Sequence, residues 1–135
     1  MSDIERKIYE DHIRKEELYQ IRYELMGMML NQVLISLIVH KRKWESIYIY
    51  GGGYIGIQAY RAFSPYANVV GMIDRTGGLM IPIDGVRVYS LEEFATEYDR
   101  KSPVIITPIE AAPKIYEDLA NSIDKERIYY INEIF

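Results

Sequence analysis

The hexapeptide Gly-Gly-Gly-Tyr-Ile-Gly carries the clearest chemical signal in this chain of 135 residues. Its residues Gly51, Gly53 and Gly56 match the pattern G-x-G-x-x-G. In that pattern the first glycine permits a tight turn, the second lets the backbone approach a phosphate, and the third lets a helix pack closely. Backbone amides at the start of the helix attract the anion. The pattern predicts a phosphate-binding turn, and we expect Tyr54 and Ile55 inside it to border the ligand.

The segments on either side of this turn are the ones that the pattern requires. Residues 47–50 form a short β-rich run, and residues 54–63 have the pattern of a helix that ends before Pro65. A lone G-x-G-x-x-G is a weak signal, whereas one placed between a strand and a helix is more specific.

A carboxylate and an arginine follow the next expected strand, at residues 69–73. Asp74 lies about twenty residues beyond the glycines, where an acid accepts hydrogen bonds from ribose hydroxyls in nucleotide-binding folds. The alternative is that Asp74 only caps a turn. Arg75 favours a phosphorylated ribose or pairs with another phosphate of the ligand. The alternative is that its side chain is only solvated.

A nearly all-apolar run at residues 103–107 predicts a strand that is buried on both faces. Because strand order reverses between the first and this fourth strand, its end should lie beside the glycine turn. Thr107 then touches the ligand and Pro108 shapes the loop. In the alternative reading, the two residues only end the strand and begin a helix.

The remaining pattern completes an α/β fold. A third strand is expected at residues 86–88, a capping box at Ser90 opens a helix, a further helix spans 111–122, and a fifth strand spans 127–131. Residues 75–84 are expected to be a loop with a small hairpin around 79–83. Residues 46–135 are therefore predicted to be a Rossmann-like domain, with a parallel five-stranded sheet and helices on both faces.

Residues 1–45 are predicted to form a long N-terminal helical arm, which either breaks near its one glycine, Gly27, or projects from the domain. Six side chains follow steps of four and three along one helical face: Tyr19, Tyr23, Met26, Leu30, Val33 and Leu37. Further apolar residues lie on other faces, so the arm needs cover on several sides. We expect a second copy of the chain to supply it, giving a homo-oligomer.

Composition excludes several classes of function. The net charge of −4 disfavours nucleic acid as a partner. The chain has no cysteine, which removes disulfides, thiolate metal sites and cysteine nucleophiles, and the expected compartment is the cytoplasm.

The longest apolar run, residues 25–39, is shorter than the roughly 20 residues that cross a bilayer, so no membrane span is expected. His12 and His40 are too far apart for a shared helical metal site, and no metal is expected.

No residue is assigned a catalytic role. No Tyr-x-x-x-Lys pair follows the fourth strand, and no serine lies in a G-x-S-x-G elbow.

Residues 46–135 resemble the CoA-binding-like Rossmann domains. The resemblance rests on residues 47–63, 70–74, 83–93 and 105–108, together with Gly78. This superfamily includes the NAD(H)-binding domain of bacterial redox-sensing repressors. It also includes nucleotide-binding domains of polysaccharide-biosynthesis epimerase/dehydratase-like proteins and of sugar acyltransferases.

The resemblance implies that the three glycines cradle phosphate, that Asp74 holds a ribose, and that Thr107 and Pro108 border the nucleotide. The arm is too short for the DNA-binding domain of the repressors, and the segments with the catalytic residues of the other relatives are missing. The first expectation is therefore a module that binds NAD(H), with NADP, a nucleotide-sugar or CoA as other possible ligands. The alternatives are part of a nucleotide-sugar or surface-polysaccharide enzyme that binds a UDP-sugar, and a non-catalytic structural domain.

Overall fold

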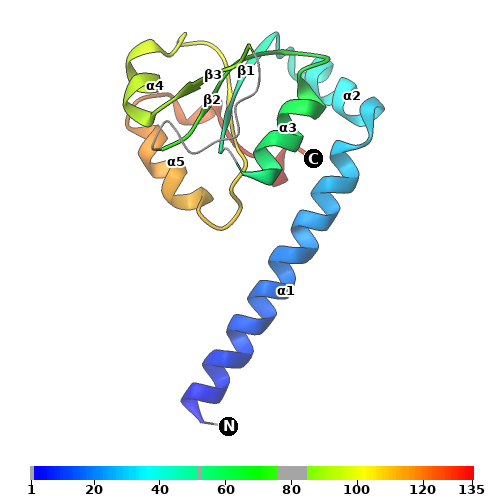
Figure 1. Cartoon of the computed structure of the whole chain (residues 1–135), viewed down its shortest axis with the longest axis vertical. Coiled ribbons are helices and arrows are strands. Elements are labelled where there is room, and N and C mark those ends of the chain that lie inside the picture. Colours follow the sequence, from blue (N-terminus) through cyan, green and yellow to red (C-terminus); the bar gives the residue numbers. More distant parts are fainter. Residues whose placement is uncertain (1, 52, 76–84) are drawn as a thin grey trace.

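A computed structural model describes residues 2–51, 53–75 and 85–135, and Figure 1 shows one long helix projecting from a layered domain. The elements follow in the order α1 (Asp3–Met29), α2 (Gln32–Arg42), β1 (Ser46–Tyr50), α3 (Tyr54–Phe63), β2 (Asn68–Ile73), β3 (Arg87–Tyr89), α4 (Leu91–Glu97), β4 (Val104–Ile106), α5 (Ala112–Ala120) and β5 (Ile128–Tyr130). Short 3-10 turns at Lys125–Arg127 and Ile131–Glu133 flank β5.

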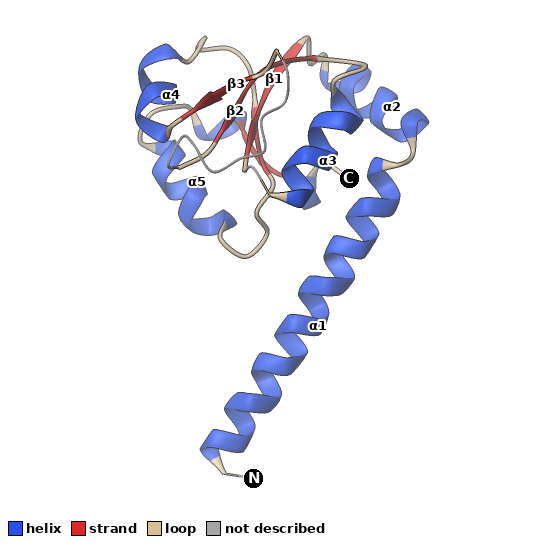
Figure 2. Ribbon diagram, viewed as in Figure 1, coloured by secondary structure: helices blue, strands red, loops and turns tan. Residues whose placement is uncertain are grey.

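The five strands form one sheet in the order β3-β2-β1-β4-β5, and every pairing is parallel. Helices lie on both sides of the sheet (Figure 2). The chain moves outward in one direction from β1 to β3 and in the other from β4 to β5, so the order reverses between β1 and β4. This is the Rossmann-like α/β fold that the sequence predicts, and ligands of open parallel sheets bind at such a reversal.

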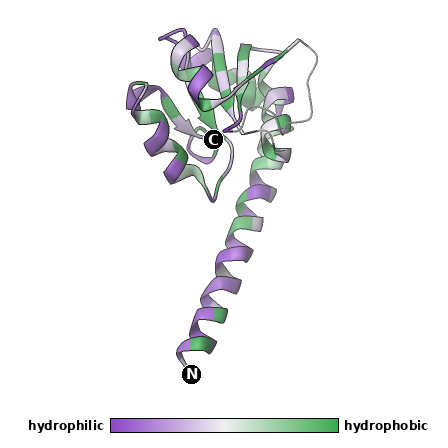
Figure 3. Ribbon diagram, turned by 60° about the vertical axis from the view of Figure 1, so that its left-hand side comes forward, coloured by the Kyte–Doolittle hydropathy of each residue, from purple (hydrophilic) through white to green (hydrophobic). Residues whose placement is uncertain are grey.

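The sheet separates two apolar cores because successive side chains of a strand point to opposite faces. Ile47 and Ile49 of β1 join α2, α3 and the end of α1 in one core. Tyr48 and Tyr50 join α4 and α5 in the other. Figure 3 shows hydrophobic residues gathered in the strands and hydrophilic ones along the outer part of α1.

The N-terminal arm both breaks and projects from the domain, and the break does not fall at Gly27. That residue lies inside α1, and the bend of 85° falls between α1 and α2. The break occurs where the side chain of Asn31 accepts a hydrogen bond of 3.1 Å from the backbone N–H of Leu34. Asparagine stabilises a helix start by this contact, whereas one glycine costs a helix only about 1 kcal/mol. The cap, not the glycine, therefore sets the position of the bend.

Helix α1 is roughly 40 Å long at 1.5 Å per residue, and only its last turns pack on the domain. Leu25 and Met29 are buried in the first core, whereas Ile4, Tyr19 and Tyr23 are exposed. Among the described residues, no single helix is both long and apolar enough to cross a bilayer. Helices α1 and α2 are long and apolar enough to cross a bilayer only when they are counted together across their bend, by length and composition alone.

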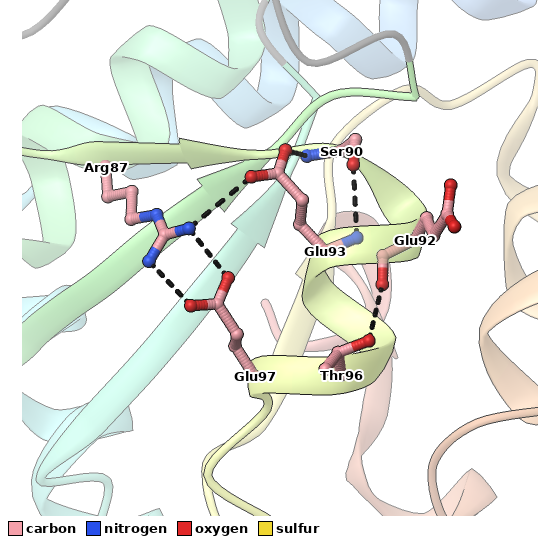
Figure 4. Close-up of polar contacts among 6 residues, drawn as sticks. All are labelled: Arg87, Ser90, Glu92, Glu93, Thr96 and Glu97. Atoms are coloured by element: carbon pink, nitrogen blue, oxygen red, sulfur yellow. Dashed lines mark hydrogen bonds and ion pairs between the residues drawn. The ribbon is translucent and has the colours of Figure 1, made fainter.

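The capping box predicted at Ser90 is present and joins β3 to α4 (Figure 4). The Ser90 hydroxyl accepts from the N–H of Glu93, whose carboxylate in turn accepts from the N–H of Ser90. The guanidinium of Arg87 lies 2.7 Å from one carboxylate oxygen of Glu97 and 3.4 Å from Glu93. These contacts join α4, from its first turn to its last residue, to the edge strand.

The other predicted boundaries are correct within about two residues, as is usual for element ends. The third strand begins and ends one residue later than expected, at Arg87–Tyr89. The fifth strand ends at Tyr130, because Ile131 already belongs to a 3-10 turn. The hairpin expected around residues 79–83 lies outside the described residues.

Candidate functional site

Gly51 forms the turn directly after β1, and this position requires a glycine. Its φ of 111° lies in the left-handed region, which side chains avoid. A Cβ there would stand 2.5 Å from Oγ1 of Thr107 and 2.7 Å from Cδ of Pro108. The turn therefore closes tightly against the loop that follows β4, in agreement with the steric role expected of the first glycine.

Gly56 allows the first turn of α3 to lie against the same backbone. A Cβ at this position would collide with the carbonyl oxygen of Gly51. The sequence predicts that the helix packs closely on the strand. In the structure, the backbone nearest to a Cβ on Gly56 is that of Gly51, in the turn after the strand. Gly51 and Gly56 together hold the start of α3 at the end of β1.

Gly53 has a different role, since the fold itself does not need it. It is the N-cap of α3 with an extended backbone, and nothing among the described residues lies within 4 Å of a Cβ placed on it. No side chain in the described part of the chain caps this helix. The first amides of a helix lack intrahelical partners, so the start of α3 offers donors at an open space.

That open space is a cavity of about 420 Å³ at the reversal point of the sheet. Its first wall is the start of α3, from Gly53 to Gly56, and its second is the loop of Thr107, Pro108 and Ile109. Tyr54 projects here and is 67% exposed. Of the predicted residues, the four from Gly53 to Gly56 line the cavity together with Thr107 and Pro108, whereas Gly51 does not line it.

The third wall of the cavity comes from the N-terminal arm, which the sequence analysis did not connect to the site. Arg22, Tyr23 and Met26 of α1 line it. Tyr23 and Met26 belong to the stripe read from the sequence as one helical face. That stripe was the available signal, but periodicity shows which residues share a face and not what the face meets.

Thr107 has a structural task in the described conformation. Its side chain is buried, and its hydroxyl donates a 2.8 Å hydrogen bond to the carbonyl of Tyr50. The backbone N–H of Thr107 donates to the same oxygen at 3.0 Å. The residue ties the end of β4 to the end of β1 and so forms the floor of the cavity.

Asp74 lies at the same edge of the sheet but does not line the cavity. Its N–H donates to the carbonyl of Tyr89, while the N–H of Gly51 donates to the carbonyl of the preceding residue, Ile73. The turn and the acid are therefore held on adjacent strand ends.

Arg75 also lies outside the cavity lining, and it shares the surroundings of the Tyr50 phenol with Asp74 and Asp118. Burial raises the pKa of Tyr50, the two carboxylates raise it further, and Arg75 lowers it. Asp74, the residue expected to hold a ribose, thus acts on the Tyr50 phenol through its charge and lies outside the lining of the cavity.

The described residues contain no cluster of three or more potential metal ligands among His, Asp and Glu. His12 is exposed and its Nε2 lies 3.0 Å from a carboxylate oxygen of Glu16, and His40 is exposed on α2. Both histidines therefore lie on the surface of the described structure.

Comparison of the chain with models of protein families, with curated proteins and with solved structures found no match. The geometry of the site is accordingly the basis for an assignment of function.

Proposed function

We propose that this chain is a nucleotide-binding module that holds the phosphates of NAD(H), or of a related nucleotide, at the glycine turn. The observation that carries the proposal is the first turn of α3, which no side chain of the described residues caps and which borders the cavity beside Gly53. Helix amides in this position bind anions through both hydrogen bonds and the helix dipole.

The surroundings of the turn support a ligand with two parts. A pyrophosphate at Gly53 extends on one side toward Asp74, which accepts from ribose hydroxyls. On the other side it extends into the cavity of about 420 Å³, a volume within the range of small-molecule sites. NADP, UDP-sugars and CoA share the pyrophosphate, so they compete with NAD(H) as ligands. A UDP-sugar would favour the alternative function in nucleotide-sugar or surface-polysaccharide metabolism.

Isothermal titration calorimetry with NADH, NADPH, UDP-glucose and CoA tests the proposal. We expect saturable binding of at least one of the four, and mass spectrometry of the purified protein identifies any nucleotide that stays bound. Absence of binding of all four at millimolar concentration would falsify the proposal.

Gly53→Val places a side chain in the space that the phosphate needs, while its extended backbone suits valine. We expect affinity to fall by about tenfold or more, or about 1.4 kcal/mol. Gly27→Val is the matched control, because Gly27 also has nothing within 4 Å of its Cβ but does not line the cavity. Equal affinity of the two variants would show that the ligand binds elsewhere.

A further inference from the structure

Two neighbouring cavities meet at one side chain of the arm, Arg22. The first is the cavity at the glycine turn, and the second, of about 430 Å³, lies between α1 and Glu110. Arg22 lines both. The α1 residues of the second cavity follow helical steps of three and four, so one face of the arm continues outward from the glycine turn: Asp11, Arg14, Lys15, Leu18, Tyr19 and Arg22.

Arg22 is placed to meet an anion. It is half-buried, and of the described residues that line the first cavity it alone carries a charge. Within the described part of the chain it forms no ion pair, whereas Arg87 pairs with Glu93 and Glu97. A guanidinium has five donors in a planar fork that matches phosphate oxygens, and it is always charged.

The opposite wall of the first cavity carries the amides at the start of α3. One phosphate at these amides leaves the charge of a second phosphate to be balanced, and the facing wall of α1 holds the cation that balances it. A diphosphate offers one phosphate to each wall, whereas a monophosphate has only one phosphate to offer.

We infer that Arg22 binds the second phosphate of a nucleoside diphosphate, or of its ester, so that the helical arm is a wall of the ligand site. This inference rests on the proposed function and extends it, since it assigns a ligand-binding role to a segment outside the Rossmann-like domain. The second cavity then has room for a group esterified to that phosphate.

Calorimetric titration of the full-length protein with ADP and AMP tests the inference. We expect Arg22→Gln to weaken ADP binding by about tenfold or more and AMP binding by less than about threefold, because only ADP offers Arg22 a second phosphate for a charged hydrogen bond. Arg22→Lys should restore part of the ADP affinity through its charge. Arg6→Gln is the control, because Arg6 lies on the same helix and lines neither cavity.

The outcomes separate the inference from the proposed function. If the wild-type protein binds ADP and Arg22→Gln binds it equally well, Arg22 has no such role, although the nucleotide site stands. If the variant loses ADP and AMP affinity to the same degree, the diphosphate specificity is wrong. If the wild-type protein binds neither of these nor any of NADH, NADPH, UDP-glucose and CoA, the proposed function fails as well. Circular dichroism of each variant shows that a loss of binding is not a loss of fold.

Discussion

The carbonyl oxygen of Gly51 occupies the space in which a side chain on Gly56 would lie. The two glycines are thereby coupled, since one makes the turn and the other lets the helix approach it. The candidate site depends on this contact because it sets where the amides of α3 point.

Gly56→Ala should therefore destabilise the protein, since the collision is with backbone and not with a flexible side chain. Overpacking of this kind costs about 1–3 kcal/mol, and we expect a loss in that range in urea denaturation. Gly27→Ala is the control, because Gly27 is exposed within α1 and a Cβ there meets nothing. Gly27→Ala should not lower the stability of the domain, since alanine is favoured over glycine in a helix by about 1 kcal/mol. Equal unfolding midpoints for Gly56→Ala and the wild type would contradict the packing described.

Ser90→Ala should cost about 1 kcal/mol in unfolding free energy, because it removes the acceptor for the N–H of Glu93 at the start of α4. Ser2 provides a comparison, since it forms the same capping box at the start of α1. Ser2→Ala should fray the projecting end of α1 without a shift of the main unfolding transition. Similar shifts for both variants would mean that the outer part of α1 unfolds together with the domain.

Asp99 should contribute stability that depends on pH. Burial alone would raise the pKa of its carboxyl, but hydrogen bonds from the Ser102 hydroxyl and from the N–H groups of Ser102 and Lys101 hold the pKa below its ordinary value of 3.8. A lowered pKa means that the stabilisation is complete above the unfolded value and is lost as pH falls through the folded value.

Asp99→Asn should accordingly lower the unfolding free energy at pH 7 by about 1 kcal/mol or more, as expected for hydrogen bonds to a charged acceptor. The difference from the wild type should shrink below about pH 4, where the carboxyl becomes protonated. Denaturation curves recorded between neutral and acidic pH measure both quantities. A difference that stays constant over this range would show that the charge of Asp99 has no role.

The homo-oligomer expected from the arm stays a prediction, and the structure indicates where to test it. Leu30, at the end of α1, is 77% exposed, and Val33 and Leu37 of α2 are 70% and 59% exposed. We expect sedimentation equilibrium to give a mass above that of one chain, and a Val33→Glu/Leu37→Glu double variant to shift it toward the monomer. A monomeric wild-type protein at high concentration would show that these side chains do not mediate self-association.

The sequence by itself determined the features whose causes are local. Glycines at Gly51 and Gly56 predict the turn, Ser90 and Glu93 predict the helix start, and alternating strands and helices predict a parallel sheet. These predictions hold because backbone sterics and capping act within a few residues. The bend of the arm was also local in origin, but Asn31 and not Gly27 sets its position.

Only the tertiary structure decided which distant segments share the candidate site. Helix α1 lies against the start of α3, so Arg22 reaches the cavity, although more than twenty residues separate them. It also showed that Asp74 and Arg75, whose charges act on the Tyr50 phenol, do not line that cavity. Such neighbours follow from how apolar faces pack in three dimensions, and a one-dimensional pattern records the face of a helix without recording its partner.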